Sequence, residues 1–244
     1  MSYFLLLWIF IIAIIFEIIS IVKYLLVDRY IKKKVILLGL SGNPPTGDSG
    51  HRGIVRAIEK LYSYDEIWIL PVYQHTFNSK RNLLPFEIRM RLCELNFGDF
   101  KNCKVLPIER DLFLYHKNIS GEEKPIGTID LLKYLNNQYN KFDFTFCLGG
   151  DTFNDLISGK WNDDDELIKT TNLLVINRQG YEINNEILQK KNTKSLRILT
   201  INTLDEVSST LIKKSLNDDN EYAMEKLYPL VYYYIKRNNL YKLN

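Results

Sequence analysis

The sequence predicts an α/β fold with a doubly wound, mostly parallel sheet, preceded by an N-terminal transmembrane helix. Short apolar segments of strand length alternate with amphipathic segments of helix length through most of the chain. This alternation is typical of a parallel sheet covered by helices on both faces. Glycines and polar residues directly follow several predicted strands. Ligands in such sheets bind beyond the carboxyl ends of the strands, so the fold class predicts a binding site at that edge.

The first thirty residues (1–30) are expected to form a membrane anchor. Tyr3–Phe16 is uninterrupted apolar sequence, Glu17 breaks it, and apolar residues continue to Val22. As a helix this stretch would span about 30 Å, the thickness of a hydrocarbon core. Basic residues follow it and none precedes it, so the positive-inside rule predicts a single-pass membrane protein whose C-terminal domain faces the cytosol. A cleaved signal peptide and an interfacial extension are the alternatives.

Residues 34–244 are expected to form one α/β domain, long enough for a full core. Its strands are short runs rich in Val, Ile, Leu and aromatic residues, and its helices repeat apolar residues at helical spacing. The predicted strands are Val35–Leu40, Glu66–Val72, Cys103–Pro107, Asp143–Leu148, Leu173–Ile176 and Leu196–Ile201. The predicted helices are Gly53–Leu61, Pro85–Phe97, Thr128–Asn137, Asp163–Lys169, Glu206–Leu216 and Pro229–Arg237.

Composition argues against several classes of function. The net charge is +3, with acidic and basic residues mixed throughout, whereas a nucleic-acid surface would show a basic stripe. The three cysteines, Cys93, Cys103 and Cys147, lie far apart in the sequence. Their odd number and wide spacing indicate neither a disulfide framework nor a metal site. We therefore expect buried thiols in a reducing compartment, and no nucleic-acid partner.

A glycine-rich segment from Gly39 to His51 joins the first predicted strand of the domain to the first helix. Small residues let the backbone approach a ligand, and a helix N-terminus offers free N–H groups to phosphates. His51 adds a donor or a cation where charge would develop in a transition state. A plain tight turn explains the glycines alone equally well.

A second phosphate-type segment lies near the other end of the chain. Ser208, Ser209 and Thr210 begin a predicted helix, and Lys213 follows one turn later. Their hydroxyls and backbone N–H groups suit the β- and γ-phosphates of a nucleotide, and the lysine suits a leaving pyrophosphate. Taken alone, the serines read more simply as a helix cap. The two segments together favour one cradle for a triphosphate.

These motifs together resemble the nucleotidyltransferase superfamily, and within it the nicotinamide/nicotinate-mononucleotide adenylyltransferases. The first segment matches the family's loop at Gly39, Ser41, Asn43, Pro44, Pro45, Thr46 and His51, and the second matches at Val207–Lys213. Weaker matches between them are Pro71, Lys80, Arg89, Gly127–Asp130, Gly149–Asp151, Trp161 and Arg178–Gly180. The likeness runs from about Val35 to Tyr241 and implies a Rossmann-like sheet of the nucleotidyltransferase type.

The resemblance implies an enzyme of NAD biosynthesis that joins AMP from ATP to nicotinamide or nicotinate mononucleotide and releases pyrophosphate. The catalytic residues it implies are His51, Thr46 and Lys213. The ATP-binding residues it implies are Gly39, Ser41, Asn43, Asp151, Ser208, Ser209 and Thr210. The residues it implies for the mononucleotide are Lys80, Arg89, Thr128, Trp161 and Arg178. Mg²⁺ would arrive with ATP, without a carboxylate cage in the protein.

Two other functions stay open. One is a related nucleotidyltransferase that uses another phosphate acceptor, such as phosphopantetheine, or that uses CTP in place of ATP. The other is a membrane-tethered nucleotide-binding protein that has lost catalysis. Departures from the family pattern motivate the second: two extra residues between Thr46 and His51, Gly42 in place of an aromatic residue, and Lys213 in place of arginine. Lysine keeps the charge but loses the bidentate fork. The choice between the two pyridine mononucleotides and the oligomeric state also remain open.

Overall fold

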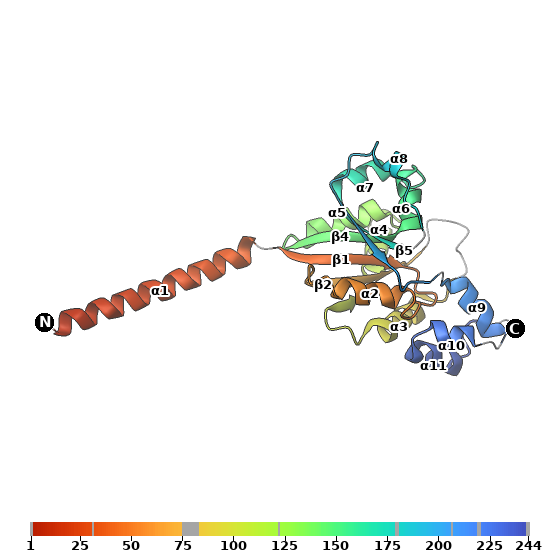
Figure 1. The fold of residues 1–244 in the computed structure, drawn as a ribbon, viewed down its shortest axis with the longest axis horizontal. Helices are drawn as coiled ribbons and strands as arrows, with labels where there is room; N and C mark the ends of the chain where they lie inside the picture. The colour runs from red at the N-terminus through yellow and green to blue at the C-terminus, as the bar shows by residue number, and fades with distance from the viewer. Residues whose placement is uncertain are drawn as a thin grey trace.

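The computed structural model describes residues 2–30, 32–74, 83–121, 123–178, 181–205, 207–218 and 221–242 (Figure 1). Its strands are β1 (Lys33–Leu40), β2 (Glu66–Pro71), β3 (Cys103–Val105), β4 (Phe142–Gly149), β5 (Asn172–Arg178) and β6 (Ser195–Ile201). They form one sheet in the order β3-β2-β1-β4-β5-β6, and every neighbouring pair is parallel. The predicted parallel sheet and all six predicted strands are confirmed.

Eleven helices accompany the sheet in the described part of the chain. They are α1 (Ser2–Tyr30), α2 (His51–Glu59), α3 (Phe86–Phe97), α4 (Ile108–Ser120), α5 (Thr128–Gln138), α6 (Gly150–Ile157), α7 (Asp164–Thr170), α8 (Asn185–Leu188), α9 (Ser209–Asn217), α10 (Tyr222–Lys226) and α11 (Pro229–Arg237). The six helices predicted within residues 34–244 are found, with ends shifted by three residues or fewer. α4, α6, α8 and α10 were not predicted.

Alternate residues of each strand face opposite sides, and both sides of the sheet are buried. On β1, Val35 and Leu37 belong to a core shared with α4, α5, α6 and α7. Ile36 and Leu38 belong to the core on the other side, shared with α2 and α3. Near-continuous apolar runs in the strands are therefore required by burial on two faces, which is what a doubly wound sheet imposes.

The C-terminal helices form a third core against α3. Leu92 of α3, Ile212 of α9, Leu227 after α10 and Val231 of α11 are its buried members, together with neighbours on the same helices. In Figure 1 these helices gather at the carboxyl ends of the strands, on the side of α2 and α3. The start of α9 is thereby carried to the edge where β1 ends.

The order of the strands places a switch point between β1 and β4. From β1 the chain builds outward through β2 and β3, and it then returns to place β4 on the other side of β1. The loops after β1 and β4 therefore leave in opposite directions and leave a crevice between them. The predicted residues at Gly39–His51 and Gly149–Asp151 follow these two neighbouring strands.

The predicted transmembrane helix is wrong, and the membrane partner predicted with it has no support in the described residues. The helix α1 exists and extends away from the sheet (Figure 1), but within the described residues no helix combines the length and the apolar character that crossing a bilayer requires. Glu17 lies near the middle of α1 and Lys23 lies further along it, and charged side chains in a spanning segment are costly. The predicted single-pass membrane location, with the domain facing the cytosol, is therefore also wrong.

Candidate functional site

Thr46 and His51 meet at the start of α2, directly beyond β1. The Thr46 hydroxyl accepts a hydrogen bond from the His51 backbone N–H at 2.7 Å, which satisfies one of the free donors of the helix start. The same hydroxyl lies 2.7 Å from His51 Nδ1, and the Thr46 backbone N–H donates to Nδ1 at 3.1 Å. The longer loop thus still delivers the imidazole to the first residue of the helix, with its orientation set by one threonine.

These contacts decide which nitrogen of His51 carries the proton. A backbone N–H can only donate, so Nδ1 must be the acceptor. In the neutral imidazole the proton then sits on Nε2. Burial lowers the pKa of His51 to about 4, so the ring is neutral at pH 7. The site therefore offers an Nε2–H donor, held in a fixed direction at the N-terminus of a helix.

Thr46 is only 1% exposed, and its hydroxyl is fully engaged with His51. We predicted a hydroxyl donor for the nucleotide phosphates at this position. The geometry instead directs the Thr46 hydroxyl at the imidazole, so this side chain reaches a ligand only through His51. Gly50 makes the contact possible, because a Cβ there would lie 2.1 Å from Thr46 Oγ1.

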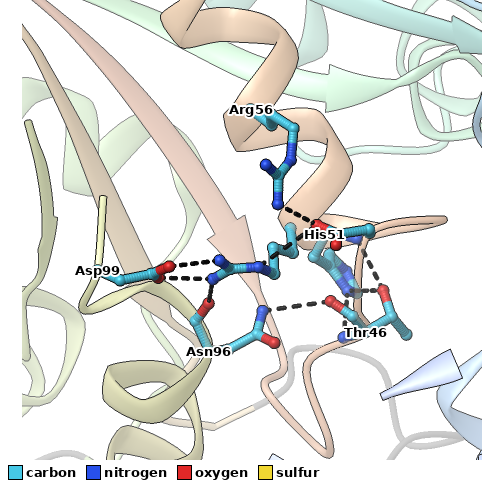
Figure 2. Close-up of polar contacts among 7 residues, drawn as sticks. Thr46, His51, Arg56, Asn96 and Asp99 are labelled. Atoms are coloured by element: carbon cyan, nitrogen blue, oxygen red, sulfur yellow. Dashed lines mark hydrogen bonds and ion pairs between the residues drawn. The ribbon is translucent and has the colours of Figure 1, made fainter. Parts of the chain in front are cut away.

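Arg52 anchors this loop to the end of α3, and Figure 2 shows the contacts around Asn96 and Asp99. Its guanidinium forms a bidentate ion pair with Asp99 just after α3, at 2.7 and 2.5 Å, and it also donates to the Asn96 carbonyl. The Asn96 side chain donates to the Thr46 carbonyl at 3.2 Å. The ring of Tyr228, before α11, stacks 3.9 Å from the guanidinium carbon. The end of α3 thereby fixes the backbone of Thr46.

The second predicted segment comes to the same place. Ser209 Oγ donates to the Pro44 carbonyl at 2.9 Å across 165 residues of sequence. Ser208 caps α9 by accepting the Leu211 N–H at 3.1 Å. The Asp205 N–H donates to the Ser49 carbonyl at 3.0 Å. The two segments thus form one structure, and α9 presents its N-terminus beside the loop that carries His51.

The remaining members of the second segment lie on α9. Thr210 is exposed in its first turn, and Lys213 is half-buried one turn further along. Gly39 is exposed at the end of β1. Ser41 follows it, half-buried, and its carbonyl accepts a hydrogen bond from Arg89. The roles we predicted for these side chains stay predictions.

Arg89 and Asn43 lie in the interior, bound to protein atoms. The Arg89 side chain is 1% exposed and donates to the carbonyls of Leu84, Ser41, Val72 and Tyr73 at 2.5–3.1 Å. Asn43 is 3% exposed, and its Oδ1 accepts from the Leu84 N–H and from the Tyr241 hydroxyl. Both side chains therefore shape the loop after β1, and the phosphate contact predicted for Arg89 has no geometric support.

Fewer contacts surround the predicted residues beyond β4 and β5. Asp151 is exposed in the first turn of α6, directly after β4. Arg178 is half-buried at the end of β5, and Thr128 is the half-buried first residue of α5. Trp161 is partly buried and packs against the core of α5, α6 and α7. Lys80 lies outside the described residues.

Sequence reasoning missed the residues that support the site. Arg52, Asn96 and Asp99 read in the sequence as ordinary members of helices or of a helix end, and only the fold brings them together. Glu109 was also missed. It accepts the Tyr73 N–H after β2, and burial raises its pKa to about 7. Arg52 lies one residue before the predicted helix Gly53–Leu61, so no helical pattern marked it in the sequence.

The chain is similar to a family of known proteins over most of its length. Residues 43–215, which include Asn43–His51 of the first segment and all of the second, match the cytidylyltransferase-like family. The chain belongs to the cytidylyltransferase-like family. The predicted kinship with nucleotidyltransferases is thereby confirmed.

Individual relatives point to one branch of the cytidylyltransferase-like family. A Clostridium acetobutylicum protein named "Probable nicotinate-nucleotide adenylyltransferase" is 29% identical over 86% of this chain and 99% of its own length. A Myxococcus xanthus protein of the same name is 28% identical over 75% and 82%. The fold matches that of Plasmodium falciparum nicotinic acid mononucleotide adenylyltransferase complexed with NaAD, with a TM-score of 0.70, 23% identity, and coverage of 87% and 98%.

Proposed function

We propose that the protein transfers the adenylyl group of ATP to a pyridine mononucleotide, with nicotinate mononucleotide as the preferred acceptor. The observation that carries this proposal is the hydrogen bond from Ser209 to Pro44. It joins the segment Gly39–His51, called the histidine loop below, to the start of α9, and the two form one cradle at the switch point of the sheet. The names of the relatives support nicotinate over nicotinamide.

The reaction needs positioning and charge stabilisation rather than a strong base. An oxygen of the mononucleotide 5′-phosphate attacks the α-phosphorus of ATP. A new P–O bond forms, the bond from the α-phosphorus to the bridging oxygen breaks, and pyrophosphate leaves with the electron pair. The attacking phosphate is already anionic, so no covalent enzyme intermediate is required.

His51 is the central catalytic group in this scheme. Its Nε2–H donates to an oxygen of the reacting phosphates, where negative charge grows in the transition state. Thr46 holds the ring so that Nε2, and not Nδ1, carries that proton. Because the direction is fixed before ATP binds, little reorganisation is needed at the moment of reaction.

The start of α9 and its side chains receive the β- and γ-phosphates. Backbone N–H groups at a helix N-terminus bind anions, and Ser208 and Thr210 add hydroxyls at this end of α9. The Ser209 hydroxyl donates to the Pro44 carbonyl, so Ser209 offers the phosphates its backbone N–H. Lys213, one turn on, neutralises the leaving pyrophosphate. Mg²⁺ enters as part of the ATP complex. In the described residues no group of three or more His, Cys, Asp or Glu side chains is placed to hold a metal.

The acceptor is assigned to the edge beyond β4 and β5. Asp151 accepts from a ribose hydroxyl or the adenine amine, and Arg178 attracts the anionic groups of the mononucleotide. For Lys80, which lies outside the described residues, the same role rests on the sequence alone. Trp161 and Thr128 complete this half of the site. Arg89 contributes by holding the carbonyls of the loop after β1 in place.

A substrate panel on the full chain tests the proposal. Pyrophosphate release is measured with ATP plus nicotinate mononucleotide, nicotinamide mononucleotide or phosphopantetheine, and with CTP in place of ATP. The dinucleotide product is identified by chromatography. We expect turnover with ATP and a higher kcat/KM for nicotinate mononucleotide than for its amide. Turnover only with CTP or phosphopantetheine, or ATP binding without turnover, would overturn the assignment.

A further inference from the structure

Three segments that are distant in sequence interlock beside the start of α9. Gly47 lies between Thr46 and His51, where the histidine loop is longer than the family pattern, and its N–H donates to the Lys226 carbonyl at 2.8 Å. Asp205, three residues before the cap of α9, donates its N–H to the Ser49 carbonyl at 3.0 Å. Lys226 Nζ pairs with Asp205 Oδ2 at 2.8 Å. Loop, turn and the end of α10 thus form a closed set of contacts.

Asp205 poses an electrostatic problem for a phosphate site. A carboxylate three residues before Ser208 lies next to the helix end that would receive the triphosphate, and like charges repel. The carboxylate is 56% exposed, and Lys226 is its partner in the ion pair. Hydrogen bonding to Asp205 raises the pKa of Lys226, so its ammonium remains charged and cancels the aspartate charge.

We propose that Lys226 is a positioning residue for ATP. Its ammonium neutralises Asp205 beside the phosphate cradle, while its carbonyl holds Gly47 of the histidine loop. This inference rests on the triphosphate lying at the start of α9, as proposed above. The lengthened loop takes part in this arrangement, because Gly47 and Ser49, both between Thr46 and His51, contact Lys226 and Asp205.

If the ion pair between Lys226 and Asp205 only stabilised the fold, its loss would lower the melting temperature and would not change the KM for ATP. Both side chains are partly exposed, at 23% for Lys226 and 56% for Asp205, and exposed ion pairs contribute little to stability. Loss of the lysine side chain should therefore leave the melting temperature almost unchanged. Its effect should fall on ATP, through the carboxylate that it leaves uncompensated.

The experiment compares full-length K226Q, D205N and the double variant D205N/K226Q. We expect K226Q to raise the KM for ATP about three- to tenfold, with kcat within about twofold of the parent. The double variant should return close to the parent KM, because the unpaired carboxylate is gone. The increase should shrink at 0.5 M salt, where surface charges are screened. K226R should behave like the parent.

Controls and a second readout keep the outcomes separate. K214Q removes an exposed lysine from α9 itself and should leave the KM for ATP unchanged. The affinity for inorganic tripolyphosphate, measured by calorimetry without an acceptor, should fall in K226Q and recover in the double variant. An unchanged KM in K226Q, or no recovery with D205N, overturns the role of Lys226. Absence of turnover in the parent would instead count against the proposed function, and the tripolyphosphate arm would still decide this inference.

Discussion

The two halves of the candidate site differ in how much the protein itself occupies their polar groups. In and beside the histidine loop, Thr46, Arg52 and Asn43 are almost fully buried, and each forms hydrogen bonds with other protein atoms. Beyond β4 and β5, Asp151 is exposed, and Arg178 forms no ion pair with any residue that the structure describes. Arranging a donor for reacting phosphates requires rigidity, whereas side chains that bind a substrate need free groups. The comparison therefore separates a prearranged catalytic half from an open binding half.

Removal of the imidazole breaks the prearranged half most severely. In His51→Ala we expect kcat to fall about 10²–10³-fold, the usual loss when one preorganised donor to a transition state is removed. The KM for ATP should change much less. Steady-state pyrophosphate release checks both constants. His116→Ala, an exposed position on α4, is the matched control and should match the parent. Unchanged turnover in His51→Ala would remove the catalytic assignment.

The burial of His51 also predicts a pH dependence of stability. The folded pKa is about 4 and the unfolded value is 6.5, so between these values the unfolded chain binds the additional proton. The unfolding free energy should therefore be retained above pH 6.5 and decline as the pH falls towards 4, by at most about 3 kcal/mol.

Chemical denaturation at several pH values measures this decline in the parent and in His51→Asn. Glu109 acts in the opposite direction over part of the range, because its folded pKa is raised to about 7. The difference between variant and parent cancels that contribution and isolates the histidine. A difference that does not vary between pH 7 and pH 4.5 would contradict a buried, neutral His51.

Two substitutions that break the same contact should have the same consequence. Thr46→Val removes the hydroxyl that orients His51, and Gly50→Ala places a Cβ 2.1 Å from that hydroxyl. We expect each to lower kcat about tenfold and to destabilise the fold by about 1–3 kcal/mol, because the His51 N–H loses its acceptor. The double variant should be no worse than the worse single variant. Additive losses would mean that the two residues act separately.

The sequence predicted the framework of this molecule better than the packing of its site. β1, β2, β4 and β5 are largely buried, and their near-continuous apolar runs predicted them. The edge strands β3 and β6 were also found, although most of their residues are partly or fully exposed. The meeting of the two phosphate-type segments could be anticipated because each suits phosphate, although the bond from Ser209 to Pro44 was not predicted. The Arg52–Asp99 pair and the Asn96 bond to Thr46 could not, because they depend on how α3 packs against the loop. α4 was missed although Pro107 and Gly121 flank it, since only a narrow face of it is buried. The membrane prediction gave too little importance to the cost of placing the Glu17 charge within a spanning helix.

The smallest effect is expected in the open half, at Asp151. Its carboxylate is exposed and makes one long contact, 3.4 Å from the Thr152 hydroxyl, so Asp151→Asn should leave stability within about 0.5 kcal/mol of the parent. If it accepts from a ribose hydroxyl or the adenine amine, the KM of one substrate should rise several-fold while kcat is nearly retained, as for a group that binds ground and transition states alike. Asp155→Asn on the same helix removes an equal charge and should change neither constant. A loss in kcat comparable to that of His51→Ala would instead place Asp151 among the prearranged groups, and the division between the two halves would no longer hold.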